Sequence, residues 1–338
     1  MWRTEVTGDQ ITDKLINSVS EDMMCDALIL DEAHNIFKPE AEIIHLLVKP
    51  DSYLYVFGDK AQRFRTLNFK TAIDFYDYLP KQTLNIKCRN TKEIESVLPQ
   101  LETQSLGNLG TSGPKPEMYC AEEKVLLSHV PQVFAKVIKE FGVTAEEVTL
   151  ITGEVGLEKL QDLKLKTKFG AEKLNATSPV WFQAMESKIV IALISLDLFK
   201  YEISFWDYQN WIEWAMTRDN VSQNAVIEYQ IVKEDFREFC EQHWSRVLAE
   251  DGTGVFDFDK KLITNRLHKQ ISGFSPNFRS PELIEIWRNI QMNFLRRISY
   301  LIFSRANFHL VNMISTETQK FIQEWNSKNG NNLPFNDF

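Results

Sequence analysis

The stretch Ala27-Leu28-Ile29-Leu30-Asp31-Glu32-Ala33-His34 decides the fold class, because it is a short apolar run that ends in two carboxylates. A second apolar run, residues 53–57, ends in Gly58-Asp59, and residues 40–48 between the two runs have the pattern of a short helix. Continuous apolar runs are typical of strands buried on both faces, and strand, helix, strand is the repeating unit of a parallel sheet. The sequence therefore predicts an α/β fold.

The two carboxylates fall where an α/β sheet binds ligands, just outside the carboxyl end of a strand. In nucleotide hydrolases the first acid at such a position holds Mg²⁺ and the second orients or deprotonates the attacking water. The other interpretation is a helix N-terminus, where Asp31 and Glu32 satisfy free backbone amides. The stretch by itself leaves both interpretations open.

The rest of the chain continues the α/β pattern and then becomes helical. A stretch with three Gly and two Pro, residues 107–116, is predicted to bulge from a second α/β unit. The other expected elements are helices over 125–141, 210–217 and 281–303 and strands over 148–152, 188–196 and 225–232. From Asp235 onward the pattern predicts only helices, so the sequence indicates a helical C-terminal region.

Composition excludes several classes of protein. The 338 residues carry 38 Lys+Arg and 47 Asp+Glu, a net charge of −9, so binding of nucleic acid or membrane by bulk charge is excluded. The four cysteines form no CxxC pattern, which argues against a disulfide framework or a zinc site and predicts an intracellular location, nucleus or cytoplasm. The most apolar C-terminal run, residues 298–303, is too short to span a bilayer, so no membrane partner is expected.

Two motifs together point to a family. Asp31-Glu32-Ala33-His34 and Gly58-Asp59-Lys60-Ala61-Gln62 each follow an apolar strand, in the order and at a spacing that suit the second and third motifs of superfamily-one helicases. The chain resembles these helicases, of the kind related to bacterial repair helicases. Their second motif is usually Asp-Glu-Ala-Gln, so His34 is a departure.

The resemblance extends through three more motifs. The fourth is matched by Leu84–Thr91, which contains Arg89, and the fifth by Val180–Glu186, in which Ala184 and Met185 replace Gly and Leu. The sixth, usually ending Thr-Arg-Ala before a strand, is matched by Trp214–Arg218, with Asp219 in place of that Ala.

The resemblance implies RecA-like P-loop NTPase lobes that bind ATP and Mg²⁺, as in an ATP-dependent DNA helicase. Arginine suits phosphate because its planar fork always carries charge. The implied roles are metal and cofactor binding for Asp31, cofactor binding for Glu186, catalysis for Glu32, Gln62, Arg89 and Arg218, and contact with single-stranded nucleic acid for Arg63 and Arg65.

The phosphate-binding loop of this class is missing from the sequence. That loop reads Gly-x-x-x-x-Gly-Lys-Ser/Thr, and no Gly in the chain is followed by Lys. We therefore expect a truncated first lobe over 1–80, a second lobe over 81–234 and the helical region over 235–338. Either the chain is part of a longer helicase-like protein or it is a degenerate relative. In both cases we expect no ATP hydrolysis from these residues alone.

Two further questions stay open at this point. The chain is similar both to helicase domains fused to nuclease-like modules and to the helicase-like part of the schlafen family. A non-catalytic module that binds nucleic acid or a protein partner is the alternative function, and an unrelated α/β domain with chance motifs is a third possibility.

Overall fold

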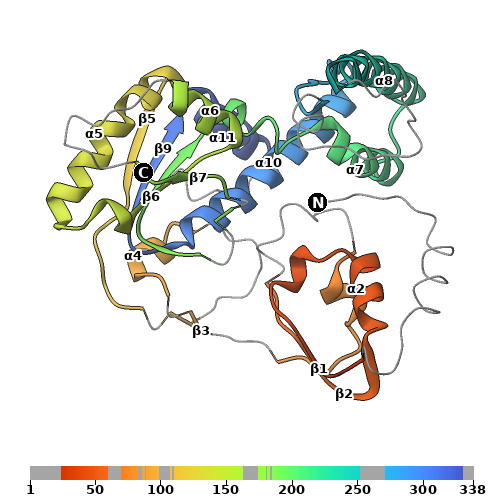
Figure 1. Cartoon of the computed structure of the whole chain (residues 1–338). Coiled ribbons are helices and arrows are strands. Elements are labelled where there is room, and N and C mark those ends of the chain that lie inside the picture. The colour runs from red at the N-terminus through yellow and green to blue at the C-terminus, as the bar shows by residue number, and fades with distance from the viewer. Residues whose placement is uncertain are drawn as a thin grey trace. The chain divides into compact units, whose positions relative to one another are not determined.

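The computed structural model (Figure 1) divides the chain into two compact units. Unit 1 contains Met1–Gln82 and Tyr208–Phe278, and unit 2 contains Thr83–Asp207 and Arg279–Phe338. The residues that the structure describes are 24–59, 70–82, 86–87, 89–98, 107–108, 110–162, 174–179, 181–182, 185–251 and 271–329. Each unit therefore combines segments from distant parts of the sequence.

The first part of unit 1 is the predicted strand, helix, strand. Strand β1 (Cys25–Leu30) pairs in parallel with β2 (Val48–Val56), with Leu30 opposite Val56. The 3-10 helix η2 (Ala33–Asn35) and helix α2 (Lys38–His45) connect the two strands. The α/β prediction is therefore confirmed for this segment.

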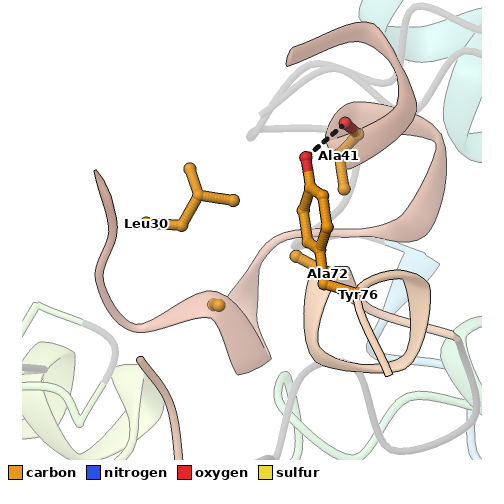
Figure 2. Packing of buried hydrophobic residues seen from close by; sticks show 5 residues of the cluster. Leu30, Ala41, Ala72 and Tyr76 are labelled. Atoms are coloured by element: carbon orange, nitrogen blue, oxygen red, sulfur yellow. Dashed lines mark hydrogen bonds between the residues drawn. The ribbon is translucent and has the colours of Figure 1, made fainter. Parts of the chain in front are cut away.

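The core of this sheet lies on one face only. Figure 2 shows Leu30 of β1 and Ala41 of α2 packed near Tyr76 and Ala72, which belongs to helix α3 (Ala72–Phe75). The Tyr76 hydroxyl donates a hydrogen bond of 3.5 Å to the Ala41 carbonyl. The opposite face keeps large apolar side chains exposed, so the prediction that both faces are buried is wrong for this sheet.

Two helices follow in the middle of the chain, α7 (Phe205–Arg218) and α8 (Gln223–Asp251). The predicted strand over 225–232 is wrong, because these residues lie in α8. Buried side chains recur there at helical spacing, at Ala225, Tyr229, Val232, Phe236 and Cys240. That periodicity places one stripe of the helix in a core and decides against a strand.

Unit 2 is built on a parallel sheet of five strands in the order β5-β9-β8-β6-β7. The strands are β5 (Glu117–Ala121), β6 (Val148–Ile151), β7 (Ala176–Thr177), β8 (Ser187–Ile194) and β9 (Ala306–Ser315). A separate two-stranded sheet joins β3 (Ile86–Lys87) to β4 (Gly107–Asn108). The predicted strands over 148–152 and 188–196 are confirmed as β6 and β8, both almost fully buried as parallel strands are.

The C-terminal region supplies a central strand of this sheet. Helix α10 (Pro281–Phe303) has the predicted bounds and begins at the cap residue Ser280, whose hydroxyl accepts a hydrogen bond from the Leu283 amide. Strand β9 follows it and lies between β5 and β8, as the blue arrow in Figure 1 shows. The prediction of an all-helical region after residue 234 is therefore wrong.

Helices cover both faces of the five-stranded sheet. Helix α5 (Glu123–Phe141) lies over the face of Glu117 and Tyr119, since Lys136 of α5 donates hydrogen bonds to both. Helix α11 (Thr316–Asn329) contacts the opposite face, where the Cys120 thiol donates to Gln319. Other helices are α4 (Lys92–Glu95), α6 (Glu154–Asp162), and the 3-10 helices η4 (Ala145–Glu147) and η5 (Leu196–Phe199). Within the described residues, no helix is both long and apolar enough to cross a membrane.

A buried histidine lies under α5 at the centre of this sheet. His309 of β9 is 1% exposed, and its Nε2 is 3.5 Å from Glu117 Oε1. Burial lowers the pKa of His309 below its ordinary value, although the nearby carboxylates of Glu117 and Glu140 oppose that effect. Lys136, the remaining charged group facing His309, favours the neutral imidazole.

We expect the free energy of unfolding to fall as the pH is lowered through the ordinary pKa of histidine, about 6.5. The folded state holds His309 at a lower pKa than the unfolded chain does, so the unfolded chain takes up the proton first. Urea unfolding between pH 8 and pH 5.5 measures this slope, and His309→Gln should flatten it. The control His129→Gln, at an exposed position of α5, should leave the slope unchanged. Equal slopes in all three proteins would contradict the assignment.

Candidate functional site

The acidic residues lie at the carboxyl end of β1, beside the end of β2. The Phe57 amide donates to the Leu30 carbonyl at 2.7 Å, and the Ala33 amide donates to the Phe57 carbonyl at 2.8 Å. These two hydrogen bonds bring the segment after β1 and the segment after β2 together. Asp31 and Glu32 therefore neighbour Gly58-Asp59, as the order of the two motifs predicts.

His34 connects the two segments further. Its Nδ1 accepts a hydrogen bond of 3.1 Å from the Asp59 amide, so the ring proton of the neutral form resides on Nε2. That Nε2 is 3.2 Å from Glu32 Oε2, and the side chain of His34 is almost fully buried. The ring therefore joins the backbone after β2 to the carboxylate of Glu32, an arrangement that the sequence did not reveal.

The backbone of Glu32 adopts a left-handed conformation with φ of 50°. The Asp31 side chain accepts a hydrogen bond of 2.8 Å from the Glu32 amide, whereas the Glu32 side chain makes no capping hydrogen bond to η2. A helix-capping role is therefore not supported for Glu32. The carboxylate is held by His34 instead, which leaves it partly exposed at the strand end.

Gly58 lies in close packing at this strand end. A Cβ atom at this position would come within 2.5 Å of Ile73 Cδ1 and 3.2 Å of the His34 amide nitrogen. A larger residue would therefore require the end of the Ile73 side chain to move and the backbone at His34 to shift slightly. The predicted site residues Gln62, Arg63 and Arg65 lie outside the described residues.

A second group of predicted residues meets in unit 2, at the amino end of the five-stranded sheet. Arg89 Nε lies 3.1 Å from Glu186 Oε2, and both side chains are about half exposed, at 51%. Glu186 directly precedes β8, and Arg89 precedes α4, whose cap residue is Thr91. The structure thus brings together Arg89 and Glu186, the two residues predicted by resemblance to belong to the fourth and fifth motifs.

A third segment joins this pair through its neighbours in sequence. Asn90 Nδ2 donates to the carbonyls of Ser304 at 3.1 Å and Ala306 at 2.5 Å, and the Ser187 amide donates to the Arg305 carbonyl at 3.0 Å. Arg305 is 2% exposed. We call Arg89, Glu186 and Arg305, with these anchoring contacts, the arginine corner.

Arg218 belongs to unit 1, whereas Arg89 and Glu186 belong to unit 2. It ends α7 and binds Asp219 through two hydrogen bonds, of 2.5 and 2.7 Å, and its guanidinium lies 4.8 Å from the centre of the Trp214 ring. The strand expected after it is helix α8. The predicted context of the sixth motif is therefore absent at Arg218.

An arginine between a helix and a strand, the context expected of the sixth motif, is found at Ser304-Arg305-Ala306. The sequence patterns did not single out this segment. Helix α10 ends at Phe303, and β9 begins at Ala306, so the arginine stands between a helix and a parallel strand. The signal was present in the sequence, because Ser-Arg-Ala is closer to Thr-Arg-Ala than Thr217-Arg218-Asp219 is.

The side chains of this chain include some, but not all, of the groups that would bind Mg²⁺ and ATP. Among the described residues, no group of three or more His, Cys, Asp or Glu side chains could hold a metal ion. Mg²⁺ is usually held by only one or two carboxylates together with water and phosphate oxygens, so Asp31 remains a suitable ligand. For ATP the arginines are present, whereas the amide cradle of a phosphate-binding loop has no counterpart in the sequence.

Comparison with known proteins adds no relative. No protein-family model matches the chain, and no curated protein matches it by sequence.

Asn90→Ala should lower the stability of unit 2 by about 2 kcal/mol, because it leaves two buried carbonyls without their donor. Chemical unfolding monitored by circular dichroism measures the change. Asn210→Ala, at an exposed position of α7, is the matched control and should change stability by less than about 0.5 kcal/mol. Equal effects of the two substitutions would show that Asn90 does not hold the arginine corner together.

Proposed function

We propose that this chain is a helicase-like nucleotide-binding module whose two units are RecA-like lobes. It binds the phosphates of ATP weakly and does not hydrolyse ATP by itself. The observation that carries the proposal is the arginine corner, where segments matching the fourth, fifth and sixth motifs are joined by hydrogen bonds. Chance motifs scattered along an unrelated α/β domain have no reason to meet in this way.

In the proposed site Arg89 binds phosphate. The Arg89 side chain is half exposed, and its Nε lies 3.1 Å from Glu186 Oε2. Because this ion pair is open to solvent, a phosphate can compete with Glu186 for the guanidinium. Arg305 stands at the helix–strand junction expected of the sixth motif, but it is 2% exposed, so we assign the contact with phosphate to Arg89.

The acidic strand end of unit 1 has its own proposed role. Asp31 is the proposed ligand of Mg²⁺, which would supply charge neutralisation to the phosphate oxygens. Glu32 is the proposed group that orients water, and His34 fixes its carboxylate through Nε2. Because His34 also binds the Asp59 amide, a shift of the segment after β2 would move Glu32.

The absence of hydrolysis follows from the missing loop. Transfer of a phosphoryl group depends on positioning and on charge stabilisation, to which the backbone amides and Lys of that loop contribute. This sequence has no Gly-Lys pair to supply them. The retained acids and arginines are therefore proposed to support binding only.

The second candidate is a non-catalytic module that binds a protein. One observation favours it, namely the exposed apolar face of the β1–β2 sheet, since surfaces of this kind mark interaction sites. Binding of single-stranded nucleic acid stays a prediction, because Arg63 and Arg65 lie outside the described residues.

Arg89→Ala should weaken the binding of a fluorescent ATP analogue about tenfold, equivalent to about 1.4 kcal/mol, because one charge-assisted contact to phosphate is lost. Fluorescence anisotropy in the presence of Mg²⁺ measures the affinity. Arg218→Ala removes an arginine of equal exposure that is engaged by Asp219, and it should leave the affinity unchanged.

Two results would contradict the proposal. One is a larger loss of affinity in Arg218→Ala than in Arg89→Ala, which would restore the original assignment of the sixth motif. The other is release of phosphate from ATP by the purified chain, abolished by Glu32→Gln, which would show that hydrolysis needs no phosphate-binding loop here.

A further inference from the structure

Helix α8 carries a second stripe of side chains on the side opposite its buried one. At about 100° per residue, the buried stripe lies within an arc of about 80° and contains Ala225, Tyr229, Val232, Phe236 and Cys240. A half turn away, within an arc of similar width, lie Ile227, Ile231, Glu234, Glu238 and Glu241. We call these last five residues the outer stripe, and all of them are exposed.

The apolar part of the outer stripe has no cover within the chain. Ile227 and Ile231 are one helical turn apart and are 53% and 56% exposed, and Val226 beside them is 40% exposed. β-Branched side chains lose rotamer freedom in a helix, and at an exposed position no burial offsets that loss. Apolar side chains one turn apart are the anchors by which helices recognise each other, so this part of α8 has the pattern of a docking surface.

The acidic part of the outer stripe decides which partner suits it. Glu234, Glu238 and Glu241 continue the line of the two isoleucines. A second copy of α8 would place glutamates against glutamates in a parallel arrangement and against isoleucines in an antiparallel one, and both arrangements are unfavourable. The phosphates of nucleic acids and of anionic lipids are repelled by the same carboxylates.

We propose that the outer stripe of α8 binds a basic amphipathic helix of another protein. Apolar side chains of that helix pack against Ile227 and Ile231, and its Lys or Arg side chains pair with the glutamates. Residues 223–243 contain five Asp or Glu and two Lys or Arg, so charge complementarity favours a basic partner over an acidic one.

The length of the stripe sets the size of the partner helix. From Ile227 to Glu241 the stripe extends over about 21 Å at 1.5 Å per residue, which a helix of about 15 residues matches. Arg237 lies 3.8 Å from Glu234 and 3.3 Å from Glu241, so it offsets part of their charge in the free chain. The proposal rests neither on nucleotide binding nor on the exposed face of the β1–β2 sheet.

Titration of the full chain with a synthetic helical peptide tests the proposal. The probe is a fluorescein-labelled peptide of about 18 residues made of Leu and Lys, with Leu along one side of the helix. A matched peptide carries Glu in place of Lys. We expect the Leu/Lys peptide to bind in fluorescence anisotropy, more weakly as salt is added, and the Leu/Glu peptide not to bind. Equal affinities of the two peptides, or no binding of the Leu/Lys peptide, would overturn the proposal.

Two double variants locate the binding on α8. Ile227→Gln with Ile231→Gln removes the apolar anchors, and Glu234→Gln with Glu238→Gln removes charge. Each should weaken binding of the Leu/Lys peptide about tenfold, and circular dichroism should show unchanged helix content because all four positions are exposed.

Matched controls make the same changes at exposed positions of α2 and α5. They are Ile43→Gln with Val125→Gln, and Glu42→Gln with Glu140→Gln, and they should leave the affinity unchanged. Equal losses of affinity in the control variants and the α8 variants would overturn the proposal. A dimer in sedimentation velocity that Ile227→Gln with Ile231→Gln dissociates would overturn it too, because the outer stripe would then bind a second copy.

Discussion

Three backbone carbonyls at the entry to β9 accept buried hydrogen bonds from distant segments of unit 2. Those of Ser304 and Ala306 accept hydrogen bonds from the Asn90 side chain, and that of Arg305 accepts from the Ser187 amide. Asn90 and Ser304 are 214 positions apart in sequence. This contact lies where β9 enters between β5 and β8, and the parallel ladders on both sides of β9 continue from that point.

The same contact determines which charged groups can act together. Asn90 follows Arg89, Ser187 follows Glu186, and Arg305 lies between the two carbonyls that Asn90 binds. An exposed ion pair such as Arg89–Glu186 contributes only about 0–1 kcal/mol to stability, so its geometry matters more than its energy. The anchoring contacts, which are buried and uncharged, keep the charged side chains in place without needing the ion pair.

Much of the fold could be predicted from local patterns, and the failures have physical reasons. The ends of α10 were predictable because Ser280-Pro281 is a strong start signal and Ser304-Arg305 follows a long apolar stripe. Residues 225–232 of α8 were predicted as a strand because a short apolar run suits a strand as well as a helix. The helical spacing becomes visible only when the buried positions Phe236 and Cys240 are included. With the last predicted strand assigned to 225–232, the strand β9 (Ala306–Ser315) was not predicted.

The candidate site was predictable to the extent that it depends on strand ends. Asp31, Glu32, Arg89 and Glu186 were identified from short motifs, and the structure brings Arg89 and Glu186 together. The role of His34 was not predictable, because it depends on the Asp59 amide, which is 25 positions away. Arg305 was missed because three residues carry little information until a helix before them and a strand after them are known.

The central claim is that β9 is an interior strand whose entry between β5 and β8 creates the arginine corner. Hydrogen–deuterium exchange of the buried β9 amides, Leu310 to Ile314, tests this most directly. The account predicts that these amides exchange as slowly as those of β8, at the rate set by unfolding of unit 2. Exchange of β9 as fast as that of the exposed positions of α11, with β8 still protected, would contradict it.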